Sequence, residues 1–391
     1  MKKLELQPSS PETQAFRGGQ KHAGVLSQNP KAVMNALSSF SHQQQPWISG
    51  VLNTACGLVP VVSTEWSSAE RRGRLRSRIS AFRDRYAVRP GLYAVGAPDS
   101  SSDIFVSANY KLSFDILRRS LAGMTGWILV LDTKGINVWC AAGKGTFGTA
   151  ELAKRVLGLN IAGLVTHSRL ILPQLGATGV NAAEVRKKTG FTVRFGPVNA
   201  KDIPAYVRAG YRATPAMRTI RFTLADRLVL TPMEVNPALR RFPLAALVIL
   251  AIFGLQPSGI IFKNAWTGGW PFLVLCLTGL LAGTLVTPAF LPVIPFRSFA
   301  LKGLAAGAAV IAPLVLMTPL GGASPLLDAA AIVLFPLVAS YLALQFTGST
   351  TFTTISGVKK ELKFWLPVYI AGIAVSLVLI IIHKLESWGL A

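Results

Sequence analysis

Short apolar runs alternate with amphipathic stretches between residues 51 and 227 of this 391-residue chain. Apolar runs of this length are typical of buried strands, whereas apolar repeats three and four residues apart are typical of helices. The predicted strands are Gly91–Ala97, Ile104–Ala108, Trp127–Asp132, Ile161–Thr166 and Phe191–Phe195. The predicted helices are Lys111–Ala122, Trp139–Leu157, Val180–Lys188 and Lys201–Ala209. Strands that alternate with helices predict a Rossmann-like α/β domain, with a mostly parallel sheet covered on both faces.

The pattern changes after Arg241, where five long apolar segments follow one another. Each is long enough to cross the hydrocarbon core of a bilayer, about 30 Å thick, as a helix. These segments run over Phe242–Phe262, Trp270–Phe290, Phe299–Leu320, Leu326–Phe346 and Trp365–His383. The sequence therefore predicts an all-α membrane domain of five transmembrane helices.

Composition and charge give this membrane domain an orientation. The chain is 51% hydrophobic with a mean hydropathy of +0.45, and 33 of its 40 Lys and Arg residues lie in the first 241 residues. That region carries a net charge of +19, and a basic region before a first span stays on the cytoplasmic side. Alternating the spans also puts Arg297, Lys302 and the loop 359–363 inside. We therefore expect a multi-pass protein of the inner cell membrane, with its N-terminal domain in the cytoplasm and its C-terminus outside.

Four regions follow from these patterns. Residues 1–45 are polar and basic, without the apolar core of a signal peptide, and we expect them to be disordered. Residues 46–227 form the α/β domain, 228–241 a basic linker and 242–391 the membrane domain. An arginine cluster at Arg71–Arg89 lacks the interleaved aromatic residues of a nucleic-acid site. Anionic membrane lipids or a solvated helix face explain it better, so we expect no nucleic-acid partner.

The run around Cys140 carries the candidate chemistry. It lies between a predicted strand and a predicted helix, and ligands of parallel sheets bind beyond the carboxyl ends of strands. The expected carboxyl-end loops are Ser107–Tyr110, Lys134–Lys144 and Thr166–Arg169. A cysteine near a helix N-terminus is favoured as a thiolate, which attacks electrophiles or binds soft metals. The alternative is that Cys140 only packs the junction, as most lone cysteines do.

Other sites fit this run less well. Gly143-Lys144 resembles part of a phosphate loop, but Val138 and Gly145 stand where that motif needs Gly and Ser or Thr. The three cysteines are far apart and form no zinc or iron–sulfur motif. His167 has no spacing that ties it to Cys140 as a catalytic base. The small residues at 141–143 leave room for a large flat cofactor, although spacing alone does not establish one.

A family resemblance becomes clear at these residues. Asn137-Val138-Trp139-Cys140-Ala141-Ala142-Gly143-Lys144 resembles the signature of the corrinoid protein of microbial mercury methylation. That family is related to the large subunit of the corrinoid iron–sulfur protein of the acetyl-CoA pathway. The similarity extends from about Trp47 to Ala225, and the five-span tail fits the same family. Further matching segments are Pro60–Thr64, Gly91–Gly96, Ser107–Lys111 and Leu170–Gly176.

The resemblance implies a membrane-anchored, corrinoid-dependent methyltransferase of anaerobic metabolism. It implies a cobalamin-type corrinoid bound base-off, with Cys140 as catalytic residue and lower axial ligand to cobalt. The methyl group would pass from methyl-cobalt(III) corrinoid to Hg(II) and form methylmercury. A strong thiolate donor favours departure of the methyl as a carbanion, and transfer as a radical stays open. The implied cofactor-binding residues are Asn137, Val138, Trp139, Cys140, Ala141, Ala142, Gly143, Lys144, Ser107 and Asn109.

Partners follow from the same resemblance. It implies a ferredoxin-like [4Fe–4S] protein that donates electrons and delivers Hg(II), together with a methyltetrahydrofolate-type methyl donor. Two alternative functions stay open: a corrinoid methyl carrier with another acceptor, and a membrane transporter or receptor with a cytoplasmic ligand-binding domain.

Overall fold

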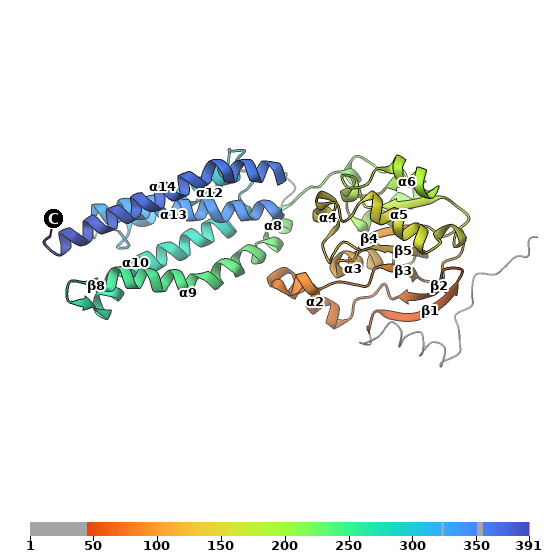
Figure 1. Cartoon of the computed structure of the whole chain (residues 1–391), viewed down its shortest axis with the longest axis horizontal. Helices are drawn as coiled ribbons and strands as arrows, with labels where there is room; N and C mark the ends of the chain where they lie inside the picture. The colour runs from red at the N-terminus through yellow and green to blue at the C-terminus, as the bar shows by residue number, and fades with distance from the viewer. Residues whose placement is uncertain (1–44, 322–323, 350–354, 391) are drawn as a thin grey trace, which may run out of the picture.

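The structure is a computed structural model that describes residues 45–321, 324–349 and 355–390. The chain forms an α/β domain and an elongated helical bundle, which lie end to end (Figure 1). The expected disordered extension, apart from residue 45, lies outside the described residues. The helices and strands of the α/β domain are β1 (Ile48–Thr54), β2 (Gly57–Val62), α2 (Ser68–Ile79), β3 (Gly91–Val95), β4 (Ile104–Ala108), α3 (Lys111–Ser120), β5 (Gly126–Leu131), α4 (Val138–Lys144), α5 (Thr149–Gly158), β6 (Arg169–Leu172), α6 (Ala182–Thr189), β7 (Thr192–Phe195) and α7 (Ile203–Arg208).

Seven strands form one sheet in the order β1-β2-β3-β5-β4-β6-β7. The strands β5, β4, β6 and β7 are mutually parallel, as are β2 and β3, whereas the β1–β2 and β3–β5 pairs are antiparallel. The sheet is therefore mostly parallel, which confirms the mostly parallel α/β sheet predicted from the sequence. The carboxyl ends of β4, β5 and β6 lie at one edge.

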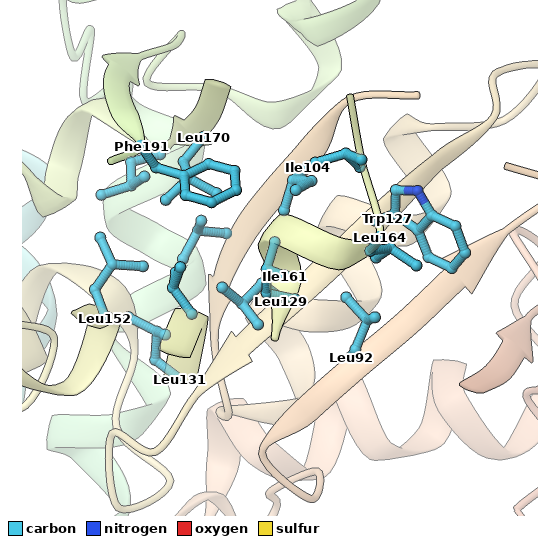
Figure 2. Close-up of a cluster of buried hydrophobic side chains, with 14 of the residues drawn as sticks. Leu92, Ile104, Trp127, Leu129, Leu131, Leu152, Ile161, Leu164, Leu170 and Phe191 are labelled. Carbon is cyan, nitrogen blue, oxygen red and sulfur yellow. The ribbon is translucent and has the colours of Figure 1, made fainter. Parts of the chain in front are cut away.

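The central strands are buried on both faces because apolar side chains alternate between two cores. On one face Ile104 and Leu129 pack with Leu152 of α5 and Phe191, beneath a turn that contributes Ile161 (Figure 2). The opposite face has its own core, formed by Phe105, Val130 and Tyr93 of the sheet with Phe114 and Leu117 of α3 and Tyr206 of α7. Every residue of β4 and β5 is buried.

The prediction of a strand at Ile161–Thr166 is wrong. Residues Ile161–Gly163 form a 3-10 turn, η2, after Asn160, whose φ of 49° is left-handed. The apolar residues of this run reach the core from the turn, because Ile161 is fully buried against the sheet. The strand that pairs with β4 on the side away from β5 is β6, which follows the turn.

The prediction of one helix over Trp139–Leu157 is also wrong. Gly145 adopts φ 79° and ends α4 in the left-handed conformation that glycine tolerates best. Phe147 then enters the core, and α5 begins after Gly148. The remaining predicted strands and helices of this domain are found within a few residues of their expected bounds, with Lys201–Ala209 divided into the 3-10 turn η4 (Ala200–Asp202) and α7.

Two elements at the start of the domain were not predicted. The hairpin of β1 and β2 adds two strands to the sheet edge. The helix α2 was hidden by its five arginines, although Ser67 and Glu70 form a capping-box pattern before it. The backbone N–H of Ser67 donates to the Glu70 carboxylate at 2.6 Å.

The bundle contains as many long apolar helices as the sequence predicted spans. Five of its helical segments among the described residues are long and apolar enough to cross a membrane: Leu224–Gly254, Phe262–Ala289, Phe299–Met317, Pro325–Gln345 and Gly357–Ser387. Its elements are α8 (Leu224–Leu230), α9 (Pro232–Gly254), β8 (Leu255–Gln256), β9 (Gly259–Ile260), α10 (Phe262–Leu281), the π-helix η6 (Ala282–Val286), α11 (Thr287–Ala289), α12 (Phe299–Met317), α13 (Pro325–Gln345) and α14 (Ile355–Ser387).

The first span differs from its prediction at both ends. The expected span Phe242–Phe262 ends too late, since α9 stops at Gly254 and a two-stranded hairpin precedes α10. The expected linker 228–241 is helical and continues into the span through α8 and α9. Proline at position 232 begins α9, where its missing N–H costs no helical hydrogen bond.

Helix α13 packs closely between α10, α12 and α14. A methyl group at Gly303 would lie 2.5 Å from Cβ of Ala343, and one at Gly283 would lie 2.5 Å from the carbonyl oxygen of Ala339. Small residues allow helix backbones to approach closely, which drives association in lipid. The glycines of α12 and η6 therefore set the distance to α13 from two sides.

Candidate functional site

Cys140 lies on α4, beyond the carboxyl end of β5. Asn137 caps this helix, and its Oδ1 accepts a hydrogen bond from the backbone N–H of Cys140 at 2.9 Å. Cys140 is half-buried, whereas Ala141 and Ala142 are buried against the domain. The helix thus directs its two alanines inward and keeps the thiol at the surface. In Figure 1, α4 lies on the side of the α/β domain nearer to the helical bundle.

Asn109 organises the loop that leads into α4. It follows β4, is buried, and its Oδ1 accepts hydrogen bonds from the backbone N–H groups of Thr133 at 3.0 Å and Gly135 at 2.9 Å. The Thr133 hydroxyl lies 2.8 Å from the same oxygen. The two backbone donors on one amide oxygen fix the loop that carries Cys140, so Asn109 acts on the site through the backbone. The sequence prediction that it contacts a cofactor did not identify this role.

The loop 174–179 packs against the side of α4 that faces the domain. A methyl group at Gly179 would clash with the Phe147 carbonyl and lie 3.0 Å from Cα of Ala142, while one at Gly176 would lie 2.5 Å from the Phe147 ring. The small size of Ala141 and Ala142 therefore serves packing against the domain. Both alanine side chains face the domain, whereas Gly143 is exposed, so the expectation that residues 141–143 leave room for a cofactor stays a prediction.

Ser107 and Val138 line a cavity of about 80 Å³ between β4, β6 and α3. Ser107 is buried, and its hydroxyl donates to the carbonyl of Ala108 at 3.2 Å. The cavity has room for small molecules such as water. A large flat molecule would have to lie outside it, against the outer surface of α4.

The predicted site residues divide into three groups. Asn137, Val138, Trp139 and Cys140 are half-buried; Gly143 and Lys144 are exposed; and Ala141, Ala142, Ser107 and Asn109 are buried. The structure brings these residues to one edge of the sheet. Sequence reasoning missed Thr133 and Gly135 as supports of the loop, although their position directly after a strand was a signal.

Gln174 adds a polar group next to α4. It begins the 3-10 turn η3 (Gln174–Gly176), which packs against α4. Its Oε1 is buried and has no hydrogen-bond partner among the described residues. Because a buried polar atom without a partner costs about 1–3 kcal/mol, a ligand N–H at this place would be stabilising.

His167 belongs to the opposite edge of the sheet. The expectation that Thr166–Arg169 follows a strand is wrong, since these residues precede β6 or begin it. The Nδ1 of His167 accepts from the backbone N–H of Arg169 at 3.1 Å, so Nε2 carries the proton and donates to the Ser102 carbonyl at 3.0 Å. His167 therefore stabilises loops away from Cys140. Among the described residues, no group of three or more His, Cys, Asp or Glu could hold a metal ion.

Comparisons with known proteins match the α/β domain. Residues 80–207 match the family model of the CO dehydrogenase/acetyl-CoA synthase delta subunit. The gamma subunit of the acetyl-CoA decarbonylase/synthase complex of Methanocaldococcus jannaschii is 31% identical over 124 residues, which are 31% of this chain and 25% of that protein. The Methanopyrus kandleri gamma subunit is 31% identical over 128 residues, 32% of this chain and 27% of its own length. The gamma 2 subunit of Methanosarcina thermophila is 32% identical over 125 residues, 31% of this chain and 26% of its own length.

The chain thus spans about a quarter of the length of these curated relatives. The region 80–207 runs from the 3-10 turn η1 (Ala81–Arg85) to α7 and includes the whole Cys140 edge. The helical bundle lies outside it. The similarity to the acetyl-CoA pathway proteins therefore concerns the α/β domain.

Proposed function

We propose that this chain is a membrane-anchored corrinoid protein that takes part in methyl transfer, with Cys140 as the lower axial ligand of cobalt. The observation that carries this proposal is the half-exposed Cys140 on α4, at the carboxyl-end edge of a parallel sheet. The helix lies within the region that matches the acetyl-CoA synthase family, and its sequence resembles a corrinoid-binding signature. Five apolar helices supply the anchor.

The residues at this edge fit a corrinoid. The outer surface of α4 offers a soft sulfur donor on a helix whose other face is anchored in the domain. The exposed Gly143 and Lys144 leave the next turn accessible, and the buried Oε1 of Gln174 can accept a hydrogen bond from a peripheral amide of the ring. A bound corrinoid would supply a cobalt that carries the methyl group.

The chain's own residues would position and tune that cobalt. Asn137 holds the backbone N–H of Cys140, and Asn109 holds the preceding loop, so the sulfur has a fixed direction. A thiolate is a stronger electron donor than a neutral histidine or water, and ligand basicity tunes a bound metal. Cys140 would thus act on the bond between cobalt and the methyl group from the opposite side of the ring.

Hg(II) is the acceptor that we propose within this function. What supports it is the intact eight-residue signature Asn137–Lys144 and its resemblance to the mercury-methylation family. A corrinoid methyl carrier with another acceptor is the second candidate, because the named relatives are subunits of the acetyl-CoA decarbonylase/synthase complex. A transporter or receptor is a weaker candidate, since the buried lysines of the bundle, Lys302 and Lys384, bind backbone carbonyls of the bundle itself.

Partner proteins follow from the chemistry. A Cys-ligated [4Fe–4S] cluster needs four cysteines, and this chain has three, at distant positions. We therefore propose a ferredoxin-like [4Fe–4S] partner as electron donor and carrier of Hg(II), and a methyltetrahydrofolate-type methyl donor. The N-terminal domain would lie on the cytoplasmic side of the inner membrane, where such partners are available.

The direct test is the absorption spectrum of the full-length protein, purified anaerobically with a corrinoid. We expect Cys140→Ala to change the cobalt bands, because the sulfur ligand is lost, whereas Cys56→Ala retains the spectrum of the unaltered protein. Cys56 is the matched control, since it lies in the β1–β2 hairpin, away from the site. Identical spectra for Cys140→Ala and the unaltered protein would refute cobalt ligation by Cys140.

Mercury as acceptor needs a separate assay. The corrinoid-loaded protein with a ferredoxin-like partner and a methyl donor is expected to form methylmercury from Hg(II). Formation of none, by a protein with the sulfur-ligated spectrum, would contradict Hg(II) as substrate and favour the methyl carrier.

A further inference from the structure

A basic hollow of about 1050 Å³ lies between α2 and α3, apart from the Cys140 edge. Four arginines line it: Arg71, Arg74 and Arg78 from α2, and Arg119 from α3. The three arginines of α2 are spaced three and four residues apart, so they share one face of the helix. We name this group of four the arginine hollow.

Trp66 fixes part of the arginine hollow in place. Its indole N–H donates to the carbonyl of Asp115 at 3.0 Å, which ties the ring to α3. The guanidinium carbons of Arg74 and Arg119 lie 5.5 and 5.0 Å from the centre of this ring. Cation–π contacts thus hold two arginines from different helices around one anchored aromatic side chain.

The positive charge of the hollow is poorly neutralised. None of its four arginines has an ion pair within 4.0 Å among the described residues, and Glu65 is the one acidic residue among those that line it. Burial lowers the pKa of Arg78 and the charge of Arg74 lowers it further, against weaker opposing effects of Tyr110 and Asp226. An anion would relieve this repulsion, and the planar guanidinium fork matches the geometry of phosphate oxygens.

The hollow lies beside the first apolar helix. The Asn236 side chain of α9 donates to the carbonyl of Ile79, the last residue of α2, at 2.5 Å. The apolar part of α9 begins at Phe242, six residues later and about 9 Å along the helix, a distance similar to the depth of a headgroup layer. Helix α2 lies between the α/β sheet and the bundle (Figure 1), and it exposes the apolar Leu75 and Ile79 beside its arginines.

We propose that the arginine hollow binds a phosphate-bearing anion at the membrane surface. The same phosphate group is present in an anionic lipid headgroup and in a soluble phosphorylated compound. The position of α2 against α9, with exposed apolar side chains among arginines, favours the lipid. A lipid held there ties the α/β domain to the bilayer at a point separate from the five helices.

The test compares two pairs of arginines on the same helix in the full-length protein. The double variant Arg74→Gln/Arg78→Gln removes two charges from the hollow. The control Arg72→Gln/Arg76→Gln removes the same charge at the same spacing from exposed residues that do not line it. The probes are phosphatidylglycerol, counted by native mass spectrometry on the detergent-solubilised protein, and pyrophosphate, titrated by calorimetry into protein in phosphatidylcholine nanodiscs.

We expect the hollow pair to weaken phosphatidylglycerol binding roughly thirtyfold, because each basic residue near an anionic surface contributes about 1 kcal/mol. The control pair should weaken it only a few-fold. Loss of pyrophosphate binding by the hollow pair, with lipid binding retained, supports the proposal and identifies a soluble source. Equal effects of the two pairs on both probes, or no effect of either, would overturn it. If the hollow pair does not fold, Arg71→Gln/Arg119→Gln tests the same site from its other side.

Discussion

The α/β domain and the helical bundle bury charged side chains in different ways. In the α/β domain, the wholly buried guanidinium of Arg118 binds the carboxylates of Glu70 and Asp115. The ammonium of Lys111 lies against the same two carboxylates. Arg118 also donates to the Glu65 carbonyl at 2.8 Å, so one network joins α2, α3 and the end of β2. Buried charges in this domain are thus paired with opposite charges, and these pairs fix the position of α2 against α3.

The bundle instead satisfies its buried lysines with backbone carbonyls, at the end of α9 for Lys384 and in the turn after α11 for Lys302. The Nζ of Lys302 donates to the carbonyl of Leu291 at 2.7 Å, and that of Lys384 donates to the carbonyls of Phe253 and Leu255 at 2.9 and 3.1 Å. The last carbonyls of a helix have no partner within it and carry partial negative charge. Neither lysine has an ion pair within 4.0 Å in the part of the chain that the structure describes. Backbone dipoles thus replace carboxylates in the bundle.

The two regions also differ in how they pack. The α/β domain fills both faces of its sheet with large apolar side chains. The bundle brings backbones together at glycines, as on α12 and η6. In water, the hydrophobic effect drives apolar burial in the first region. For helices that cross a membrane, the surrounding lipid provides little hydrophobic driving force for association. Close packing at small residues is therefore expected to hold the bundle together.

The largest effect should come from breaking the charge network of the α/β domain. Arg118→Ala leaves two buried carboxylates with Lys111 as their remaining cation, and loss of one buried partner costs about 3–5 kcal/mol. Hydrogen exchange of α2 and α3 amides in the full-length protein measures this loss. Arg72→Ala on α2 is the control, because that side chain is exposed and should change stability by less than about 0.5 kcal/mol. Equal exchange in both variants would contradict a stabilising network.

The sequence predicted the class of each region better than its details. Apolar runs such as Ile104–Ala108 were assigned correctly, because a fully buried strand is apolar at every position. The apolar run at Ile161 was wrongly predicted as a strand for the same reason, because the buried residues of a turn are of the same apolar types as those of a buried strand. The five long apolar helices were recognisable by length. The charged residues before Arg241 hid the fact that the first of them begins at Leu224.

The sequence predicted that the Cys140 run lies beyond the carboxyl end of a strand, as the structure has it, but it did not predict which residues support that run. Cys140 and Asn137 were found together because they share one short run. Asn109 lies in another loop, and only the parallel pairing of β4 and β5 brings it to Thr133 and Gly135. Such contacts join residues that are far apart in the sequence and depend on the order of the strands in the sheet. Sequence patterns alone therefore do not predict them.

A glycine substitution would sharpen the packing comparison. In Gly303→Ala the new methyl group lies 2.5 Å from Cβ of Ala343 and 2.8 Å from the carbonyl of Ala339, so the helices must separate. We expect a loss of about 1–3 kcal/mol, typical of overpacking, seen as a lower resistance of the bundle to denaturing detergent. Gly158→Ala, at the end of α5, meets nothing within 4 Å and should be neutral or slightly stabilising. Equal stability of the two variants would mean that α12 and α13 do not depend on this approach.

The smallest effect that we predict concerns the hydrogen bonds that connect the α/β fold with its site. Asn109→Ala leaves the N–H groups of Thr133 and Gly135 without their acceptor, at a cost of about 1–2 kcal/mol in the loop before α4. We expect faster amide hydrogen exchange over residues 132–137 and weaker binding of the corrinoid, with the hydrogen exchange of the bundle unchanged. Asn109→Asp keeps an oxygen for the same donors and should restore slow exchange. Asn181→Ala removes the exposed cap of another helix, α6, whose oxygen accepts from the backbone N–H of Glu184, and should leave the loop 132–137 unaltered. If Asn109→Ala exchanges no faster than Asn181→Ala, the loop is held by other contacts and Asn109 is not a positioning residue.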